Sequence, residues 1–103
     1  MSTDYETQQW LVLLTPSRES FPADATPSEL AAVGEHFAML QRERDAGRLV
    51  LAGRSQDAHP IGIVILEGMS RGDVERLMES DAGVRAGVFR YELRPYSVAL
   101  LRE

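Results

Sequence analysis

The stretch WLVLL occupies residues 10–14 and is followed at once by Thr15 and Pro16. A short apolar run without polar interruption is typical of a β-strand that is buried on both faces. We therefore predict a strand over residues 8–16. A second run of this kind, GIVIL at residues 62–66, predicts another strand over residues 61–66. Both faces of the resulting sheet should be apolar.

A helix start lies downstream of the first strand, after a connection at residues 17–25 that is long enough to border a binding site. Thr26 and Glu29 have the spacing of a capping box, and Pro27 suits the first helical position. Gly47 is placed to end this helix, so we predict it over residues 27–46. Its apolar residues recur every three or four positions, and we expect them to face the core: Leu30, Val33, Phe37 and Leu40.

The rest of the sequence predicts two more strands and a second helix. Residues 48–53 predict a strand that pairs with residues 61–66 through a polar turn. Ser70 begins a short second helix, with Asp73 at the reciprocal capping position. Residues 81–87 contain two glycines, which predicts a turn-rich connection that can include a helical turn. The last strand is expected over residues 89–101, with Pro95 allowing a bend or an edge position.

This order predicts one domain over residues 1–103 with a ferredoxin-like α+β fold, βαββαβ. A four-stranded antiparallel sheet would carry two helices on one face, which leaves its other apolar face uncovered. A patch of that size is unusual on a monomer, so we predict a homodimer that packs through the sheet face, as in a dimeric α+β barrel. Substitutions of Trp10 or Ile63 should weaken this assembly.

The composition of the chain excludes several classes of function. The chain has 11 basic and 16 acidic residues and a formal charge of −5, so we expect no nucleic-acid partner. All 11 basic residues are Arg and there is no Cys, which excludes lysine Schiff bases, disulfides and thiolate nucleophiles. No apolar run approaches the roughly 20 residues of a membrane span. The polar, acidic start is unlike a secretory signal, so we predict a cytoplasmic protein without membrane association.

Two residues are candidates for acid/base chemistry. His36 flanks the apolar stripe of the first helix, where an imidazole can titrate near neutrality. The alternative is a surface histidine bonded locally or to water. Asp81 directly follows the second helix, where its charge opposes the negative helix end, so that helix stability alone does not explain it. Its alternative role is a turn-forming aspartate that bonds nearby backbone amides.

Other candidates are less distinctive. Arg54 and Arg94 could bind a carboxylate or phenolate ligand, although pairing with the excess acidic residues is equally natural. Three aromatic residues of the strands, Trp10, Tyr91 and Tyr96, could line a ligand cavity between helix and sheet or fill the core, and core filling is expected for Trp10. His59, with Asp57 nearby, has no third ligand at structural spacing, so no metal site is predicted. Glycine-rich phosphate loops and nucleophile elbows are missing from the sequence, and we predict no cofactor.

The chain resembles the YCII-related (YciI-like) family from the first strand to Tyr96. The resemblance is carried by His36 followed by Leu40, Gly47-Arg48-Leu49 leading to Ala52-Gly53, Gly62-Ile63-Val64-Ile65, Asp81 followed by Ala86-Gly87-Val88-Phe89, and Arg94-Pro95-Tyr96. It implies a ferredoxin-like fold, a dimeric α+β barrel and an active-site pair formed by His36 and Asp81. The chain departs from the family where Gly53-Arg54 replaces a frequent Gly-Pro. It departs again where Asp81-Ala82-Gly83 replaces Asp-Pro followed by an aromatic residue.

The sequence leaves two classes of function open. In the first, a cofactor-free enzyme uses His36 and Asp81 to move a proton on a small, aromatic or lactone-like molecule, or oxygenates an aromatic substrate. In the second, the same pocket binds a metabolite without turnover, or the dimer serves a partner protein.

Overall fold

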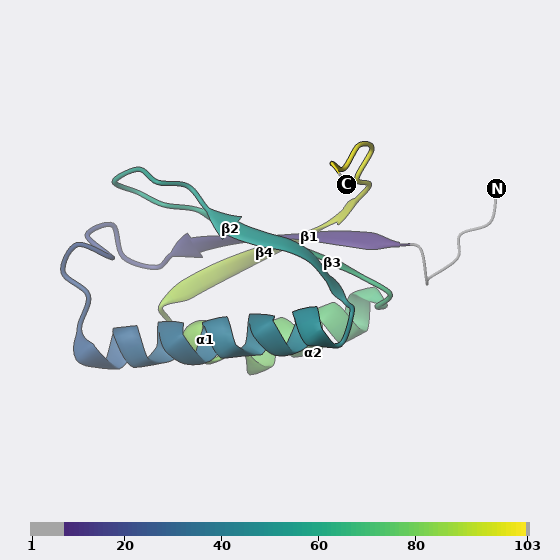
Figure 1. The fold of residues 1–103 in the computed structure, drawn as a ribbon. Coiled ribbons are helices and arrows are strands. Elements are labelled where there is room, and N and C mark those ends of the chain that lie inside the picture. The colour runs from purple at the N-terminus through teal and green to yellow at the C-terminus, as the bar shows by residue number, and fades with distance from the viewer. Residues whose placement is uncertain (1–7, 103) are drawn as a thin grey trace.

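The computed structural model describes residues 8–102, in which a four-stranded antiparallel sheet carries its helices on one face (Figure 1). The strands are β1 (Gln9–Pro16), β2 (Leu49–Arg54), β3 (Gly62–Glu67) and β4 (Phe89–Tyr96). The helices are α1 (Pro27–Asp45), α2 (Arg71–Ser80) and α3 (Ala82–Arg85). The strand order is β2-β3-β1-β4, with antiparallel neighbours throughout. The predicted ferredoxin-like arrangement is therefore confirmed.

The helix starts follow the predicted capping chemistry. The Thr26 side chain accepts a hydrogen bond from the Glu29 amide, and the Glu29 carboxylate accepts one from the Thr26 amide at 2.8 Å. Gly47, with φ at +79°, lets the chain turn after α1. At α2, the Ser70 hydroxyl accepts from the Asp73 amide. These caps satisfy amides that the helices themselves leave without partners.

The side chains of β1 alternate between two environments, as the pleat of a strand requires. Trp10, Val12 and Leu14 point toward the helices and form the centre of the core. Trp10 also donates from its indole nitrogen to the Met69 carbonyl at 2.8 Å. The expectation that Trp10 fills the core is therefore confirmed, whereas the expectation that its substitution would weaken a contact at the uncovered sheet face is wrong. Ile63 pairs with Leu13 and does lie on that face.

The buried face of α1 differs from the predicted stripe by one position. Phe37 is 59% exposed and Leu30 is 58% exposed, which corrects their assignment to the core. The buried residues are Ala32, His36, Met39 and Glu43. The helix can turn a histidine and a glutamate inward because both have partners, Asp81 for His36 and Arg48 for Glu43.

The last strand is shorter than predicted and ends at Tyr96. β4 lies at the sheet edge and pairs only with β1, which is the kind of position where a strand tolerates a proline such as Pro95. Beyond β4 the chain has no regular structure up to residue 102 and lies on the side of the sheet opposite the helices (Figure 1). Its Val98 amide donates to the Gln9 side chain at 2.8 Å.

The face opposite the helices has an apolar strip beside a charged one. β1 contributes Leu11 and Leu13, β3 contributes Ile63 and Ile65, and the register places these side chains next to one another. The neighbouring positions of β4 on this face are charged: Arg90, Glu92 and Arg94. Among residues 8–102, no helix is long and apolar enough to cross a membrane.

Candidate active site

His36 and Asp81, 45 residues apart in the chain, meet beneath the sheet. The Nδ1 atom of His36 lies 2.8 Å from Oδ1 of Asp81. The Asp81 side chain is fully enclosed, whereas that of His36 is 10% exposed. α1 supplies the histidine from its buried face, and the junction between α2 and α3 supplies the aspartate. The two predicted acid/base residues are therefore in direct contact.

The Asp81 carboxylate has a second partner. Its Oδ2 atom accepts a hydrogen bond from the Val84 amide at 3.2 Å, so Asp81 also caps α3. The turn-forming role considered from the sequence is thus present together with the histidine contact. An ionised carboxylate can only accept hydrogen bonds, so the proton in the contact with His36 belongs to Nδ1. This arrangement fixes the ring and leaves the Nε2 lone pair available.

The other side of the His36 ring borders a cavity of about 460 Å³. Every buried side-chain nitrogen and oxygen within residues 8–102 has a partner, and His36 Nε2 makes no hydrogen bond to any residue of that range. The Nε2 atom must therefore be reached by solvent, and the cavity that His36 lines is the route. An imidazole held by a carboxylate on one side and open to a cavity on the other can accept a proton from a bound molecule.

The cavity lies between α1 and the β2–β3–β1 part of the sheet, where several of the sheet residues are small. Ala52, Gly53 and Gly62 contribute little side-chain volume there, so α1 does not meet a filled surface. The other lining residues are Leu14, Pro16, Phe21, Val33, His36, Phe37, Leu40, Arg54, Pro60, Ile61, Ile63, Val64 and Phe89. Apart from His36 and Arg54, all of these side chains are apolar.

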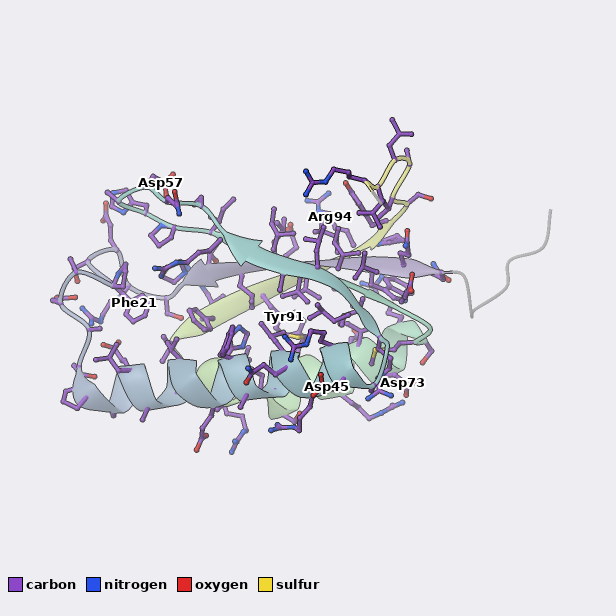
Figure 2. The ribbon with its side chains drawn as sticks, viewed as in Figure 1. Phe21, Asp45, Asp57, Asp73, Tyr91 and Arg94 are labelled. Atoms are coloured by element: carbon purple, nitrogen blue, oxygen red, sulfur yellow. The ribbon has the colours of Figure 1, made fainter. Side chains whose placement is uncertain are left out.

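The connection at residues 17–25 closes one end of the cavity. Phe21 is buried and directs its ring inward from this loop (Figure 2). Arg18 holds the loop on the helix start, donating to the Glu29 carboxylate at 2.6 and 3.1 Å and to Asp24 at 2.7 Å. The Arg18 hydrogen bond, supported by the Thr26 amide, lowers the pKa of Glu29 to about 2. Arg18 also holds the pKa of Asp24 below its usual range.

The structure separates the remaining candidates. Arg54 lines the cavity with His36, because its position in β2 places it on the helix side of the sheet, opposite Gly62. Arg94 lies on the opposite face, where it donates to Glu92 at 3.0 Å (Figure 2). Tyr96 is 45% exposed on that same face. The expectation that Arg94 and Tyr96 share a site with His36 therefore does not hold within one chain.

His59 lies outside the cavity that His36 lines, in the hairpin between β2 and β3. The Ser55 hydroxyl in this hairpin donates to Asp57 at 2.9 Å and accepts from the Ile61 amide. In the described part of the chain, no three His, Asp or Glu side chains are grouped closely enough to hold a metal ion.

The aromatic lining was missed from the sequence. The chain has three phenylalanines, Phe21, Phe37 and Phe89, and all three line the cavity. Phe89 stands edge-on to the His36 ring with centroids 5.2 Å apart, and edge-on to Phe21 at 6.1 Å. One signal for it was present in the sequence, because Phe37 directly follows His36 and so must lie close to any cavity beside that residue.

Comparison with known proteins supports the fold. No protein-family model matches the chain, and no curated protein sequence matches it. Solved structures do match. One is the 5-chloro-2-hydroxyhydroquinone dehydrochlorinase TftG from Burkholderia phenoliruptrix AC1100 in complex with 2,5-dihydroxybenzoquinone, with a TM-score of 0.56 and 18% identity over 84% of this chain and 93% of that one.

A second match is the C-terminal domain of the MgtC protein from Mycobacterium tuberculosis, with a TM-score of 0.55 and 14% identity over 98% of this chain and 100% of that one. At these identities, the two likenesses establish a shared fold.

Proposed function

We propose that the chain is a small enzyme that transfers protons with the His36–Asp81 pair, without a metal or organic cofactor. Its substrate would be a small conjugated molecule, aromatic or lactone-like. One observation carries this proposal: the buried Asp81 carboxylate contacts His36 Nδ1 at 2.8 Å while the ring lines an apolar cavity. A carboxylate-oriented imidazole at the wall of a cavity is the arrangement that a general base requires.

The reaction would begin with transfer of a substrate proton to His36 Nε2. The electron pair left behind moves into the conjugated system of the substrate. It then either takes back a proton at another atom, which is an isomerisation, or expels a leaving group as an anion, which is an elimination. The negative Asp81 carboxylate stabilises the imidazolium while His36 carries the proton. Phe21 and Phe89 supply apolar wall beside His36, which would limit the water around the reacting atoms.

Two likenesses support this class of reaction. The sequence pattern around His36 and Asp81 is similar to that of YCII-related proteins, for which a His-Asp pair is the suggested active site. The Burkholderia protein with the same fold is a dehydrochlorinase, and its structure holds a hydroxylated quinone. Loss of hydrogen chloride is an elimination, which a base facing a conjugated ring can promote.

The test uses deuterium. Small phenols, hydroxyquinones including 2,5-dihydroxybenzoquinone, and lactones are first screened for thermal stabilisation of the protein. Each compound that binds is then incubated with the protein in D₂O and followed by mass spectrometry. An enzyme of the proposed kind exchanges a carbon-bound hydrogen of a bound compound, or converts the compound, faster than buffer does; hydroxyl hydrogens exchange in buffer alone and are not counted.

His36→Gln and His59→Gln form a matched pair, because the chain has two histidines and His59 lies outside this cavity. We expect His36→Gln to bind the compounds without exchange, and His59→Gln to behave as the parent does. Equal exchange by His36→Gln and the parent would refute the acid/base role. Binding by the parent with no exchange of any compound would identify a metabolite-binding protein instead.

The aromatic lining favours one further enzyme class, cofactor-free oxygenation of an aromatic substrate. In that reaction His36 would deprotonate the substrate, and the resulting electron-rich anion would react with O₂ between the rings of Phe21, Phe37 and Phe89. Oxygen consumption measured with the same compounds distinguishes the two classes, since isomerisation and elimination use no O₂.

We also propose that the chain forms a homodimer through the sheet face opposite the helices, where Leu11, Leu13 and Ile63 form an apolar strip. Light scattering coupled to size exclusion would then give about twice the 11.5 kDa chain mass. Leu13→Asp should shift the protein to a monomer, and Ala31→Asp, on the exposed surface of α1, should not. A parent protein that elutes as a monomer at all concentrations would rule the dimer out.

A further inference from the structure

The walls of the cavity are aromatic on several sides. Phe89 and Phe21 pack edge to face at an interplanar angle of 83°, and Phe89 also stands edge-on to His36. Phe37 approaches from α1 and is 59% exposed. A phenylalanine that lines a cavity and yet is largely open to solvent has apolar surface that a bound ring could cover. The walls therefore favour a flat, conjugated occupant.

The charges around the cavity have one sign. Of the lining residues, only His36 and Arg54 can carry a charge, although the chain as a whole has a formal charge of −5. Asp81 is enclosed behind His36 and does not line the cavity. An acidic protein that presents a guanidinium and no carboxylate to an apolar cavity provides a local site for an anion.

Arg54 is also available to a ligand. Six other arginines of the chain form ion pairs with acidic side chains: Arg18, Arg44, Arg48, Arg71, Arg76 and Arg94. Arg54 has no carboxylate within ion-pairing distance among residues 8–102. Its β2 position opposite Gly62 leaves the space beneath it open, because no side chain of β3 projects there.

We propose that this cavity binds a small aromatic anion, a carboxylate or a phenolate. The anionic group lies on the Arg54 guanidinium, and the ring lies among Phe21, Phe37 and Phe89 with its reacting atom toward His36. This inference rests on the proposed acid/base function and names the substrate class of that site. The cavity of about 460 Å³ is in the range of roughly 300–1,000 Å³ that is usual for small-molecule sites.

The positive charge of Arg54 should also promote the proposed proton transfer. Removal of a proton by His36 adds negative charge to the conjugated ligand, and a guanidinium fixed against the same ligand stabilises that charge. Arg54 thus has two roles, to select anions from neutral analogues of the same shape and to stabilise the deprotonated ligand.

The experiment compares charged and neutral ligands of one shape. Benzoate and 2,5-dihydroxybenzoate are titrated against their amides by NMR with ¹⁵N-labelled protein, followed at Arg54 Nε and the His36 ring. We expect the parent to bind each acid at least about tenfold more tightly than its amide, as a charged hydrogen bond would provide. Arg54→Gln should lose that preference and keep the amide affinity. Arg44→Gln, on an exposed arginine outside the cavity, should match the parent.

Three results would overturn the inference: equal affinities of the parent for acid and amide, an unchanged preference in Arg54→Gln, or no binding of either acid at millimolar concentration. His36→Gln separates this inference from the proposed function. An anion preference that survives in His36→Gln, with exchange lost, supports both. Exchange that survives in His36→Gln refutes the acid/base role, while the parent and Arg54→Gln affinities still decide the anion site.

Discussion

Gly83 lies directly against the ring of Phe89. A Cβ atom placed on Gly83 would come within 2.6 Å of Phe89 Cδ2 and 3.2 Å of Asp81 Oδ2. Carbon atoms do not approach one another so closely without displacement, so a glycine at this position is what allows Phe89 to pack beside α3. Phe89, in this position, stands edge-on to His36, and Asp81 contacts the same histidine.

Gly83→Ala should therefore destabilise the protein. Overpacking of this kind costs about 1–3 kcal/mol. The control is Gly34→Ala, an exposed α1 position with open space around the added methyl group, which should stabilise by about 0.5–1 kcal/mol. Urea denaturation measures both. A Gly83→Ala protein as stable as the parent would mean that Phe89 can move freely, and that the His36 environment does not depend on this contact.

Asp81→Asn should change the tautomer of His36. In the parent, the carboxylate selects the ring form with its proton on Nδ1. An asparagine can present its NH₂ group to Nδ1 and so favour a proton on Nε2, which removes the base from the cavity. The ¹⁵N shifts of the imidazole report the tautomer, and His59→Gln assigns the two histidines. Turnover of any substrate should fall about 100-fold or more. An unchanged His36 spectrum in Asp81→Asn would contradict the assignment.

The anchoring of the 17–25 loop through Arg18 and Glu29 should weaken as the pH falls. The pKa of Glu29 falls from 4.5 to about 2 because Arg18 bonds its carboxylate. A lowered folded-state pKa gives stability that is complete above the unfolded pKa and lost as pH falls through the folded one. This contribution should therefore decline between pH 4.5 and 2. Glu29→Gln should lose that part of the pH dependence, measured by urea denaturation, and Glu35→Gln on the exposed side of α1 should keep it. Identical profiles for Glu29→Gln and the parent would contradict this role.

Tyr91 should lose its proton at a higher pH than an ordinary tyrosine. Its ring lies between the sheet and the helices (Figure 2), where the Glu79 carboxylate beside it, together with burial, raises the pKa of Tyr91 from 10.0 to about 12. A raised folded-state pKa gives stability that is present below pH 10 and lost as pH rises toward 12. Titration of tyrosinate absorbance should show a late phase that Tyr91→Phe removes and Tyr96→Phe retains. A late phase that survives in Tyr91→Phe would exclude this assignment.

Met39 should contribute to the stability of the fold, and Phe37 to the binding of ligands. Phe37 is 59% exposed and Met39 is 6% exposed, although the apolar spacing in the sequence points to Phe37 as the core residue. Phe37→Ala should change stability by no more than about 0.5 kcal/mol, and Met39→Ala should cost about 2–5 kcal/mol. Phe37→Ala should instead weaken binding of aromatic ligands. If Phe37→Ala were instead the more destabilising of the two substitutions, the apolar stripe predicted from the sequence, with Phe37 in the core, would be correct.

Most elements of the fold were predictable, because each has a local signal. The Thr26–Glu29 capping box marks the start of α1, and the two apolar runs mark β1 and β3. The end of β4 was not predictable in this way. The chain remains apolar after Tyr96, and the strand stops where its only partner, β1, begins at Gln9. The limit of an edge strand depends on the length of its neighbour, which local sequence does not contain.

The candidate site was predictable only in part. His36 and Asp81 were identified as residues, but His36 was expected at a boundary with solvent, because hydrophobic periodicity counts histidine as an outward residue. It lies on the buried face because Asp81, 45 residues away, satisfies it. The cavity also depends on distant partners, since small residues of β2 and β3 lie opposite α1. Spacing along one element carries no information about the size of the residues that face it.

The two hydrogen bonds of Asp81 have a consequence for mutational tolerance. Because the same carboxylate caps α3 and orients His36, losing it should impair folding and chemistry together. Selection for abundance alone should therefore retain Asp81 in a saturation library. Arg54 is exposed and should tolerate replacement under that selection, becoming restricted only when the cell requires the reaction. A comparison of the two selections would thus reveal the function through Arg54 and conceal it at Asp81.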